Sequence, residues 1–440
     1  MIPLETAKEI LDKTISPLIN IYRKKELVPL TEAGGRILAN DVTAEMDVPS
    51  FDRSPVDGYA LISADTQTAT PTSPILLTVI DMVAAGSNPS KSLSTGTAIK
   101  IFTGAPLPLG ADCVIKKEEV AEIDVASAGF LASDDYPSSG NLRSSDHQSF
   151  SPISIRKSVI KGENVAGKGE DIANGEFLFS AGTLLKPAHL GILATLGMDY
   201  VEVFERPKIG IFSTGNELID VHAPLQNGKL RASNLYTLSE LIRQAGGIPV
   251  NLGLIKDRID DVIAAYDRAS ELQLPIVIST GGTASGDYDV IKDALDQISA
   301  NRMFDKVAMR PGAPVLTATR KNQLIIGLSG NPAGATVAML LVVWPLIAQL
   351  AGTNQSLIST YGNLTTPLQR QGGLRGFLWG SYVDVASLAD DSTESLHVTP
   401  DENQFCGAIK TYARSNCLIE IPAGKVDLSA GDKIKIWKLL

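Results

Sequence analysis

The chain has 440 residues, of which 44% are hydrophobic and 20% are charged, and its formal net charge is −10. This length indicates about three domains, and this composition is typical of a folded soluble protein and excludes global disorder. The negative charge balance argues against non-specific nucleic-acid binding, so any anion site in this chain has to be locally basic.

The sequence lacks the usual signals for export, for a membrane span and for a structural metal. Its three cysteines, Cys113, Cys406 and Cys417, form no CxxC pair, so we expect neither a zinc site nor a disulfide framework. Residues 1–5 do not begin a basic and then apolar leader, which favours a cytoplasmic protein. The most apolar stretch, 338–348, is about half of the roughly 20 residues that cross a bilayer, so it predicts a buried core helix and no membrane insertion.

The first part of the chain predicts one helix followed by a β-rich region. Apolar residues at helical spacing indicate an amphipathic helix within 4–28, and short runs bounded by Gly and Pro then indicate strands and turns to about residue 120. Residues 121–150 are rich in Ser and Asp and predict an exposed loop. The clearest strands on either side of this loop are predicted at 75–80, 97–102, 153–159 and 176–184.

Strands and helices alternate in the second part of the chain. This alternation predicts a doubly wound α/β domain with right-handed crossovers. Its strands are predicted at 209–212, 250–255, 276–279 and 324–327, and its helices at 233–245, 259–272, 287–299 and 332–350. After Gly352 the pattern returns to short strands with turns, which predicts a small β-barrel or sandwich.

Three glycine-marked turns follow apolar strands in the α/β part. They contain Thr214-Gly215-Asn216-Glu217, Gly281-Gly282 and Ser329-Gly330-Asn331-Pro332. Ligands bind beyond the carboxyl ends of the strands in doubly wound sheets, and the helix N-termini that follow favour anions. The three turns therefore predict an anion site along one sheet edge. The alternative is that they are βα turns with no ligand.

The second turn is the most informative segment. Gly281, Gly282 and Gly286 allow a bulky anion to approach the backbone, and Lys292 follows Asp289 by about one helical turn.

The third turn has a partly structural explanation, because Asn331 is expected to cap a helix that begins with Pro332. The segment Arg310-Pro311-Gly312-Ala313-Pro314 supplies rigidity and one guanidinium, although such a string alone is more often only a loop.

Acidic residues mark several turns of the β-rich part. Asp57 lies in an Asp-Gly turn, Thr103 lies in the string 102–106, and Glu170 lies in the string Gly169-Glu170-Asp171. Read alone, an Asp-Gly string is most often turn chemistry. As isolated strings these segments establish no function.

In their joint order these strings resemble the MoeA family, the molybdenum-inserting enzymes of molybdenum-cofactor synthesis, which include the E domain of gephyrin. The resemblance covers nearly the whole chain and is specific through the order of its parts. It implies an enzyme that takes adenylylated molybdopterin and molybdate, cleaves the adenylyl-phosphate link with a divalent cation, expected to be Mg²⁺, and yields molybdenum cofactor and AMP.

The resemblance also implies four domains, a homodimer with a cleft shared between subunits, and contacts with other proteins of the same pathway. The boundaries expected from it are 1–45 with 152–185, 46–151, 186–352 and 353–440. They correspond to a linking domain, a β-rich domain, the molybdopterin-binding α/β domain and a C-terminal β-barrel.

Site roles carry over from the family only at matching positions. The implied catalytic residues are Asp57, Thr103, Glu118 and Glu170. The implied molybdopterin- and molybdate-binding residues are Thr214, Gly215, Asn216, Glu217, Gly281, Gly282, Gly286, Asp289, Lys292, Arg310, Pro311, Pro314, Ser329, Gly330, Asn331 and Pro332. No metal ligand is assigned.

The chain departs from the usual family pattern at several of these strings. The departing residues are Asn216 for Asp, Ala232 for Asp, Ala284 for Ser, Ala313 for Lys or Arg, Ser329 for Pro and Gly334 for Ser. Each lost charge-assisted hydrogen bond to an anion costs about 1.5–3 kcal/mol, so these changes leave the choice between molybdate and tungstate open. They also leave open a paralogue that binds molybdopterin or a partner protein without inserting the metal, and a generic nucleotide-binding α/β protein is a third reading.

Overall fold

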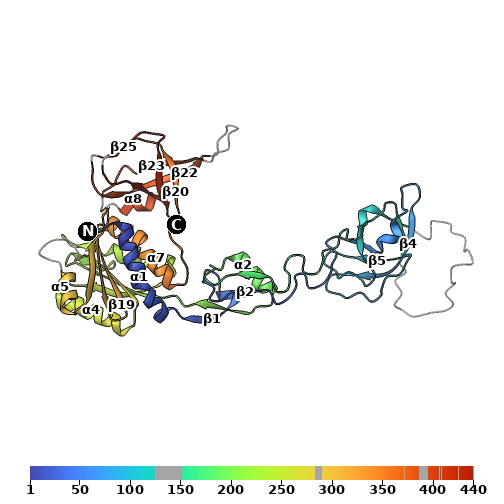
Figure 1. The fold of residues 1–440 in the computed structure, drawn as a ribbon, viewed down its shortest axis with the longest axis horizontal. Coiled ribbons are helices and arrows are strands. Elements are labelled where there is room, and N and C mark those ends of the chain that lie inside the picture. Colours follow the sequence, from blue (N-terminus) through green and yellow to red (C-terminus); the bar gives the residue numbers. More distant parts are fainter. Residues whose placement is uncertain are drawn as a thin grey trace, which may run out of the picture. The chain divides into compact units, whose positions relative to one another are not determined.

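The fold is described from a computed structural model (Figure 1). The structure describes residues 1–123, 151–282, 290–370, 372–385, 395–405, 407, 409–424 and 426–439. The site predictions at Ala284, Gly286 and Asp289 and most of the predicted loop 121–150 lie outside these residues. The chain divides into a large unit, Met1–Asn40 with Ser180–Leu190 and Asp199–Leu440, and a small unit, Asp41–Phe179 with Gly191–Met198.

A six-stranded sheet in the order β14-β11-β15-β19-β18-β16 forms the centre of the large unit. The first four strands are parallel, and β18 and β16 continue the sheet antiparallel. The parallel strands confirm the four predicted from sequence, while the antiparallel pair was not predicted. The bounds are β11 (Lys208–Thr214), β14 (Ile248–Ile255), β15 (Ile276–Thr280), β16 (Asn301–Lys306), β18 (Pro314–Arg320) and β19 (Gln323–Leu328).

Helices cover both faces of this sheet, as a doubly wound fold requires. Ile276 and Ile278 of β15 pack with α1, α3, α6 and α7, whereas Val277 between them packs with α4 and α5. Figure 1 shows α4 beside α5, and α1 beside α7. The bounds are α1 (Leu4–Tyr22), α3 (Ser233–Gln244), α4 (Ile259–Glu271), α5 (Val290–Gln297), α6 (Pro332–Ala338) and α7 (Trp344–Leu350).

The helical run Pro332–Leu350 is the most deeply buried part of the core. It consists of α6, the π-helical turn η4 (Met339–Val343) and α7. Within the described part of the chain this run alone is long and apolar enough to cross a membrane, yet 89% of its apolar window is buried inside the protein. The run is therefore a core helix, in agreement with the sequence prediction for 338–348.

The three glycine turns lie side by side, because β11, β15 and β19 are neighbours in the sheet. The N–H of Gly281 donates to the carbonyl of Leu328 at 3.2 Å. A Cβ at Gly281 would lie 2.1 Å from the carbonyl oxygen of Thr214, and a Cβ at Gly330 would lie 3.3 Å from Cα of Gly281. The turns pack backbone against backbone, which only glycine permits at position 281.

A closed five-stranded barrel completes the large unit. Its strands follow the order β22-β23-β20-β26-β24, and β24 pairs back with β22. The short strand β17 (Met309–Arg310) runs parallel to the start of β22 and joins the barrel to the segment beside the sheet. The other bounds are β20 (Ser359–Leu364), β21 (Leu368–Arg370), β22 (Arg375–Val385), β23 (Ser395–Pro400), α8 (Ile409–Arg414), β24 (Cys417–Ile421), β25 (Val426–Leu428) and β26 (Lys433–Lys438).

The remainder of the large unit contains an antiparallel ribbon of β1 (Lys25–Pro29) and β10 (Tyr200–Phe204) and a two-strand pair of β12 (Leu218–Ile219) and β13 (Leu230–Arg231). The predicted N-terminal helix therefore ends at Tyr22. Helix α2 (Pro187–Thr195) begins in the large unit and ends in the small unit.

The small unit is β-rich, as predicted. Its sheet has the order β6-β3-β5-β4-β8-β7 and encloses two apolar clusters. The bounds are β2 (Val42–Thr43), β3 (Gly58–Leu61), β4 (Ile75–Val83), β5 (Thr97–Ile101), β6 (Cys113–Lys116), β7 (Val120–Glu122), β8 (Ile153–Ile155), β9 (Phe177–Phe179) and the 3₁₀ turns η1 (Leu30–Glu32, in the large unit), η2 (Ser63–Thr66) and η3 (Lys117–Glu119). The fold classes of the α/β domain, the β-rich domain and the C-terminal barrel are thereby confirmed, and the four-domain boundaries stay a prediction.

Replacing Gly281 with Ala tests the close packing of the turns. We expect the substitution to lower the free energy of unfolding by at least about 2 kcal/mol, because the new Cβ meets a backbone carbonyl and the residue has a φ of +89°. Gly228→Ala is the matched control, since its φ is +74° and no atom lies within 4 Å of the added Cβ. In urea denaturation, Gly228→Ala should lower the free energy of unfolding by about 1 kcal/mol. Equal losses in the two variants would contradict the packing argument.

Candidate functional site

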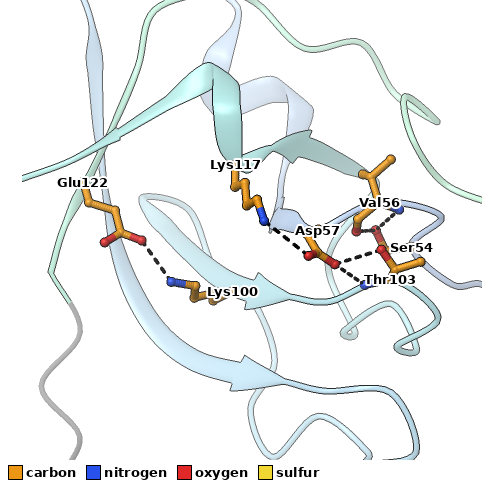
Figure 2. Close-up of polar contacts among 7 residues, drawn as sticks. All are labelled: Ser54, Val56, Asp57, Lys100, Thr103, Lys117 and Glu122. Carbon is orange, nitrogen blue, oxygen red and sulfur yellow. Dashed lines mark hydrogen bonds and ion pairs between the residues drawn. The ribbon is translucent and has the colours of Figure 1, made fainter.

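Asp57 of the small unit is held by two neighbouring loops (Figure 2). Its Oδ1 accepts hydrogen bonds from the backbone N–H of Thr103 at 2.9 Å and from the Thr103 hydroxyl at 2.8 Å. Its Oδ2 lies 3.5 Å from Nζ of Lys117. The predicted pair of Asp57 and Thr103 is therefore in direct contact, and Lys117 adds a cation that was not predicted.

Local sequence fixes the position of Asp57. The hydroxyl of Ser54 donates to the Val56 carbonyl at 2.6 Å and closes the turn before it. Gly58 follows in β3, where a Cβ would lie 2.0 Å from the carbonyl oxygen of Ile115. The Ser54 turn and the absence of a Cβ at Gly58 together direct Asp57 toward Thr103.

The surroundings of Asp57 favour its ionised form. The backbone N–H of Thr103 has the largest effect, and with the Thr103 hydroxyl and Lys117 it holds the pKa of Asp57 below the ordinary value of an aspartate. A lowered pKa means that the ionised form persists above the ordinary value and is lost only as pH falls through the lowered one. Asp57 is therefore a carboxylate throughout the range of about pH 5–8.

The other two acids of the small unit are placed separately. Glu118 lies on the exposed turn η3 next to Lys117. Glu170 accepts a hydrogen bond from the N–H of Gly167 at 2.8 Å and closes its own turn. Among the described residues of this unit, no hydrogen bond or ion pair joins Glu118 or Glu170 to Asp57.

In the large unit, an acid from the next strand holds the first glycine turn. Asp257, just beyond β14, accepts hydrogen bonds from the Thr214 hydroxyl at 2.5 Å and from the Asn216 N–H at 2.9 Å. The Oδ1 of Asn216 accepts a long hydrogen bond from the Asp257 N–H at 3.4 Å, and Lys229 donates to the Asn216 carbonyl at 2.6 Å. Position 216 has an amide, and the carboxylates beside this turn come from Asp257 and from Glu217, whose oxygens would lie 2.7 Å from a Cβ at Gly215.

Two further contacts join the turns. Asn234 at the start of α3 donates through Nδ2 to the Gly330 carbonyl at 2.9 Å. The hydroxyls of Ser213 and Thr280 lie 2.8 Å apart in the buried ends of β11 and β15. Lys292 of α5 pairs with Asp305 of β16 at 3.6 Å, so part of its charge is neutralised within the protein.

A cavity of about 290 Å³ opens beside the third turn, between the α/β domain and the barrel. Its walls come from the end of β19, the first turn of α6, the segment after β17 and one barrel residue. Five of the predicted site residues line it. The complete lining is Met309, Arg310, Pro311, Gly312, Ala313, Pro314, Ser329, Asn331, Gly334 and Leu374.

The polar groups of this cavity have few partners within the protein. Asn331 stands at the N-cap position of α6, yet its side chain makes no capping hydrogen bond, and its buried Oδ1 has no partner in the described structure. The expected capping role of the Asn331 side chain is therefore wrong. The Ser329 hydroxyl oxygen accepts from the Asn331 N–H at 3.1 Å, which leaves its own proton free to donate. No ion pair or side-chain hydrogen bond within the described residues uses the Arg310 guanidinium.

Three of the departures from the family pattern meet in this cavity. Ala313 contributes no charge, and Gly334 contributes no hydroxyl. A Cβ at Gly334 would lie 3.3 Å from Cβ and 3.4 Å from Oγ of Ser329, so a larger residue at 334 would press against the Ser329 side chain. The cavity consequently presents one guanidinium, one hydroxyl and one amide.

This donor set suits a small oxyanion, because guanidinium and hydroxyl groups bond directly to oxyanion oxygens. In the described part of the chain no three His, Cys, Asp or Glu residues gather into a metal cluster. Asp257, Lys229 and Lys117 are contact residues that the sequence reasoning missed. A signal for Asp257 was its position just beyond a predicted parallel strand, at the sheet edge where ligands bind.

Three regions of the chain match known families. Residues 2–197 match the MoeA N-terminal region (domain I and II), residues 210–349 match the probable molybdopterin binding domain, and residues 361–439 match the MoeA C-terminal region (domain IV).

Individual relatives are similar along nearly their whole length. A molybdopterin molybdenumtransferase of Bacillus subtilis (strain 168) is 32% identical over 412 residues, which are 93% of this chain and 89% of that protein. One of Nostoc sp. is 30% identical over 428 residues, 96% of this chain and 91% of that protein. The crystal structure of the molybdopterin biosynthesis moeA protein from Pyrococcus horikoshii superimposes with a TM-score of 0.78 at 27% identity and covers 100% of both chains.

Removing the Thr103 hydroxyl should weaken the hold on Asp57. We expect Thr103→Val to raise the pKa of Asp57 toward its ordinary value, because the hydroxyl bond disappears while the backbone N–H remains. Thr103→Ser keeps the hydroxyl and should leave the pKa where it is. Carboxyl-detected NMR titration of the two variants measures this difference, and an unchanged pKa in Thr103→Val would contradict the assigned contacts.

Proposed function

The chain belongs to the MoeA family of molybdopterin molybdenumtransferases, and we propose that it transfers molybdate into adenylylated molybdopterin and releases AMP. The chain is thus an enzyme of molybdenum-cofactor biosynthesis. A binding protein without catalysis is not favoured, because relatives that carry the transferase name are 30–32% identical over 93–96% of the chain.

We assign the oxyanion to the cavity beside the third turn. The observation that carries this assignment is the set of unused polar groups, namely the unpaired Arg310, the donating Ser329 hydroxyl and the uncapped Asn331 amide. The exposed Arg310 guanidinium and the half-buried Ser329 hydroxyl can donate to oxyanion oxygens. The buried Oδ1 of Asn331 is an acceptor, so it would need a donor such as a water or a protonated oxyanion oxygen. The rigid segment with Pro311 and Pro314 would keep Arg310 in place.

The pterin and its phosphate are assigned to the adjacent turns. The assigned residues are Thr214, Gly215, Glu217, Gly281, Gly282 and Gly330, with Pro332 at the helix start. Turn N–H groups such as that of Gly282 would bond the phosphate. Gly281 and Pro332 would instead shape the site, because the N–H of Gly281 already bonds the Leu328 carbonyl and proline has no N–H. Gly286, Asp289 and Lys292 belong to the same proposal by resemblance. Asp257 would keep the first turn in the binding conformation through its bonds to Thr214 and Asn216.

The acids of the small unit are proposed to act on the adenylyl-phosphate link. Asp57 stays ionised at neutral pH, and within the described residues its Oδ2 has Lys117 as its one polar partner, so it can orient a water or the substrate. Thr103 positions Asp57, and Glu118 and Glu170 are the further candidates.

Mg²⁺ is part of the proposal through the family resemblance. The residues fit it, because Mg²⁺ usually takes one or two carboxylates together with substrate phosphates and waters, and Asp57 offers such an oxygen. When bound, the ion would neutralise charge on the phosphates.

Several broader features also remain proposals. They are a homodimer with a shared cleft, contacts with other pathway proteins, a cytoplasmic location, the four-domain boundaries, and tungstate as a possible second oxyanion.

Single-turnover conversion of adenylylated molybdopterin tests the proposal directly. Molybdate and tungstate are titrated separately while AMP release and cofactor formation are followed. We expect oxyanion-dependent AMP release, and we expect Asp57→Asn to slow it by about 100-fold or more. Asp65→Asn is the matched control, because the Asp65 carboxylate also accepts a backbone N–H, from Gly96 at 2.9 Å, and this bond joins η2 to the turn before β5. Tight pterin binding without AMP release at millimolar oxyanion would overturn the proposal.

Adding a cation to the cavity should strengthen oxyanion binding. We expect Ala313→Lys to lower the half-saturating molybdate concentration by about tenfold or more, since one charge-assisted hydrogen bond contributes about 1.5–3 kcal/mol. Ala264→Lys, on the exposed side of α4, is the control with the same charge change and should leave this concentration unaltered. Equal effects of the two variants would place the oxyanion elsewhere.

A further inference from the structure

A second cavity of the large unit, of about 300 Å³, is lined by three arginines, Arg36, Arg206 and Arg243. It is formed by the segment beside the β1–β10 ribbon, the C-terminal end of α3 and the chain after α7. Its other polar lining consists of uncharged side chains such as Thr353 and Gln355, and no Asp or Glu is among the residues that line it. In a chain with a net charge of −10, a cavity with this lining is unusual.

The three guanidinium groups differ in how many hydrogen bonds and ion pairs they make within the protein. Arg36 is held in place, with a side chain that is 13% exposed, by an ion pair with Glu26 and a bond of 2.9 Å to the Phe204 carbonyl. Within the described part of the chain, Arg206 makes one long bond of 3.5 Å to the Gly35 carbonyl, so most of its donors have no protein partner there.

Arg243 pairs with Glu240 at 3.1 Å, but both side chains are more than half exposed, at 58% and 57%. Such a surface pair contributes at most about 1 kcal/mol and is easily exchanged for another anion. Counting Glu26 and Glu240 against the three arginines leaves one net positive charge, and the two acids stand outside the cavity lining.

Helix capping does not account for this arrangement. Cations near the C-terminus of a helix can bond its last carbonyl groups. Neither Arg206 nor Arg243 makes such a bond to α3, because their side-chain partners are Gly35 and Glu240. The three arginines therefore line the cavity and do not cap the C-terminal end of α3.

We propose that this cavity is a binding site for a small multivalent phosphate anion, separate from the site assigned above. Planar guanidinium groups bond phosphate oxygens in pairs, and three of them on three chain segments match an anion with several oxygens. The cavity lies at the lower limit of ligand pockets in volume, and its three guanidinium groups on separate segments favour a compact di- or polyphosphate over a single phosphate group. A bound anion would link the ribbon segment, the end of α3 and the chain after α7.

Binding of inorganic pyrophosphate to the full-length protein in a phosphate-free buffer tests this proposal. Isothermal calorimetry gives the dissociation constant, and thermal unfolding reports the accompanying stabilisation. We expect saturable binding at or below the millimolar range, with orthophosphate as a second arm that shows whether one phosphate group suffices.

The variant Arg206→Gln/Arg243→Gln removes the two less constrained cations and keeps amide donors of similar reach. We expect its pyrophosphate dissociation constant to rise by about tenfold or more. The control is Arg258→Gln/Arg268→Gln, at the N-cap and in the last turn of α4. It makes the same change of net charge, and its dissociation constant should stay within about twofold of that of the unmodified protein.

Unchanged circular dichroism verifies folding of both variants. Absence of binding to the unmodified protein, or equal losses in the two variants, would overturn the proposal. Molybdate-dependent AMP release in the Arg206→Gln/Arg243→Gln variant keeps this outcome distinct from any failure of the proposed function.

Discussion

The close approach of three backbones at one sheet edge is the constraint on which the large unit depends. Gly281 hydrogen-bonds to the end of β19 while its Cα faces the carbonyl of Thr214 at the end of β11. Strand order brings these turns together, and the absence of a side chain lets them touch. The loop N–H groups and the first turn of α6 are consequently placed beside the cavity of Arg310 and Asn331 before any ligand arrives.

The parallel core of the fold was predictable because its sequence signal is strong and local. Apolar β-branched runs followed by Gly and then a helical period define β11, β15 and β19 with little ambiguity. The antiparallel pair β16 and β18 escaped prediction because β16 is an edge strand with the polar sequence Asn301–Lys306, and its pairing across β18 is a long-range property. The N-terminal helix was predicted within 4–28 and ends at Tyr22, and residues from Lys25 onward form the strand that pairs with β10.

The candidate site was predictable in its residue types but not in its connections. The sequence indicated Asp57 and Thr103 separately, and their direct contact depends on two loops closing around Ser54 and Gly58. Asp257 was missed because its role arises from the neighbouring strand, not from a motif around it. Asn331 was assigned to capping from its position before Pro332, and its side chain instead lacks the bond that capping requires. In each case a local sequence pattern does not show which residue, distant in the sequence, the side chain contacts in the folded protein.

The parallel bridge between β17 and β22 has a consequence for modularity. Met309 and Arg310 pair with Arg375 and Gly376, and Leu374 next to this bridge forms part of the cavity wall. The barrel is closed and has its own apolar core, yet it is joined to the α/β domain by this strand pairing and forms part of the cavity wall. A chain shortened before β20 would keep every strand of the central sheet and still lose one side of the pocket. A barrel exchanged between homologues, in evolution or in the laboratory, has to supply residues that pair with β17 as Arg375 and Gly376 do. Otherwise the strand pairing beside Arg310 is lost.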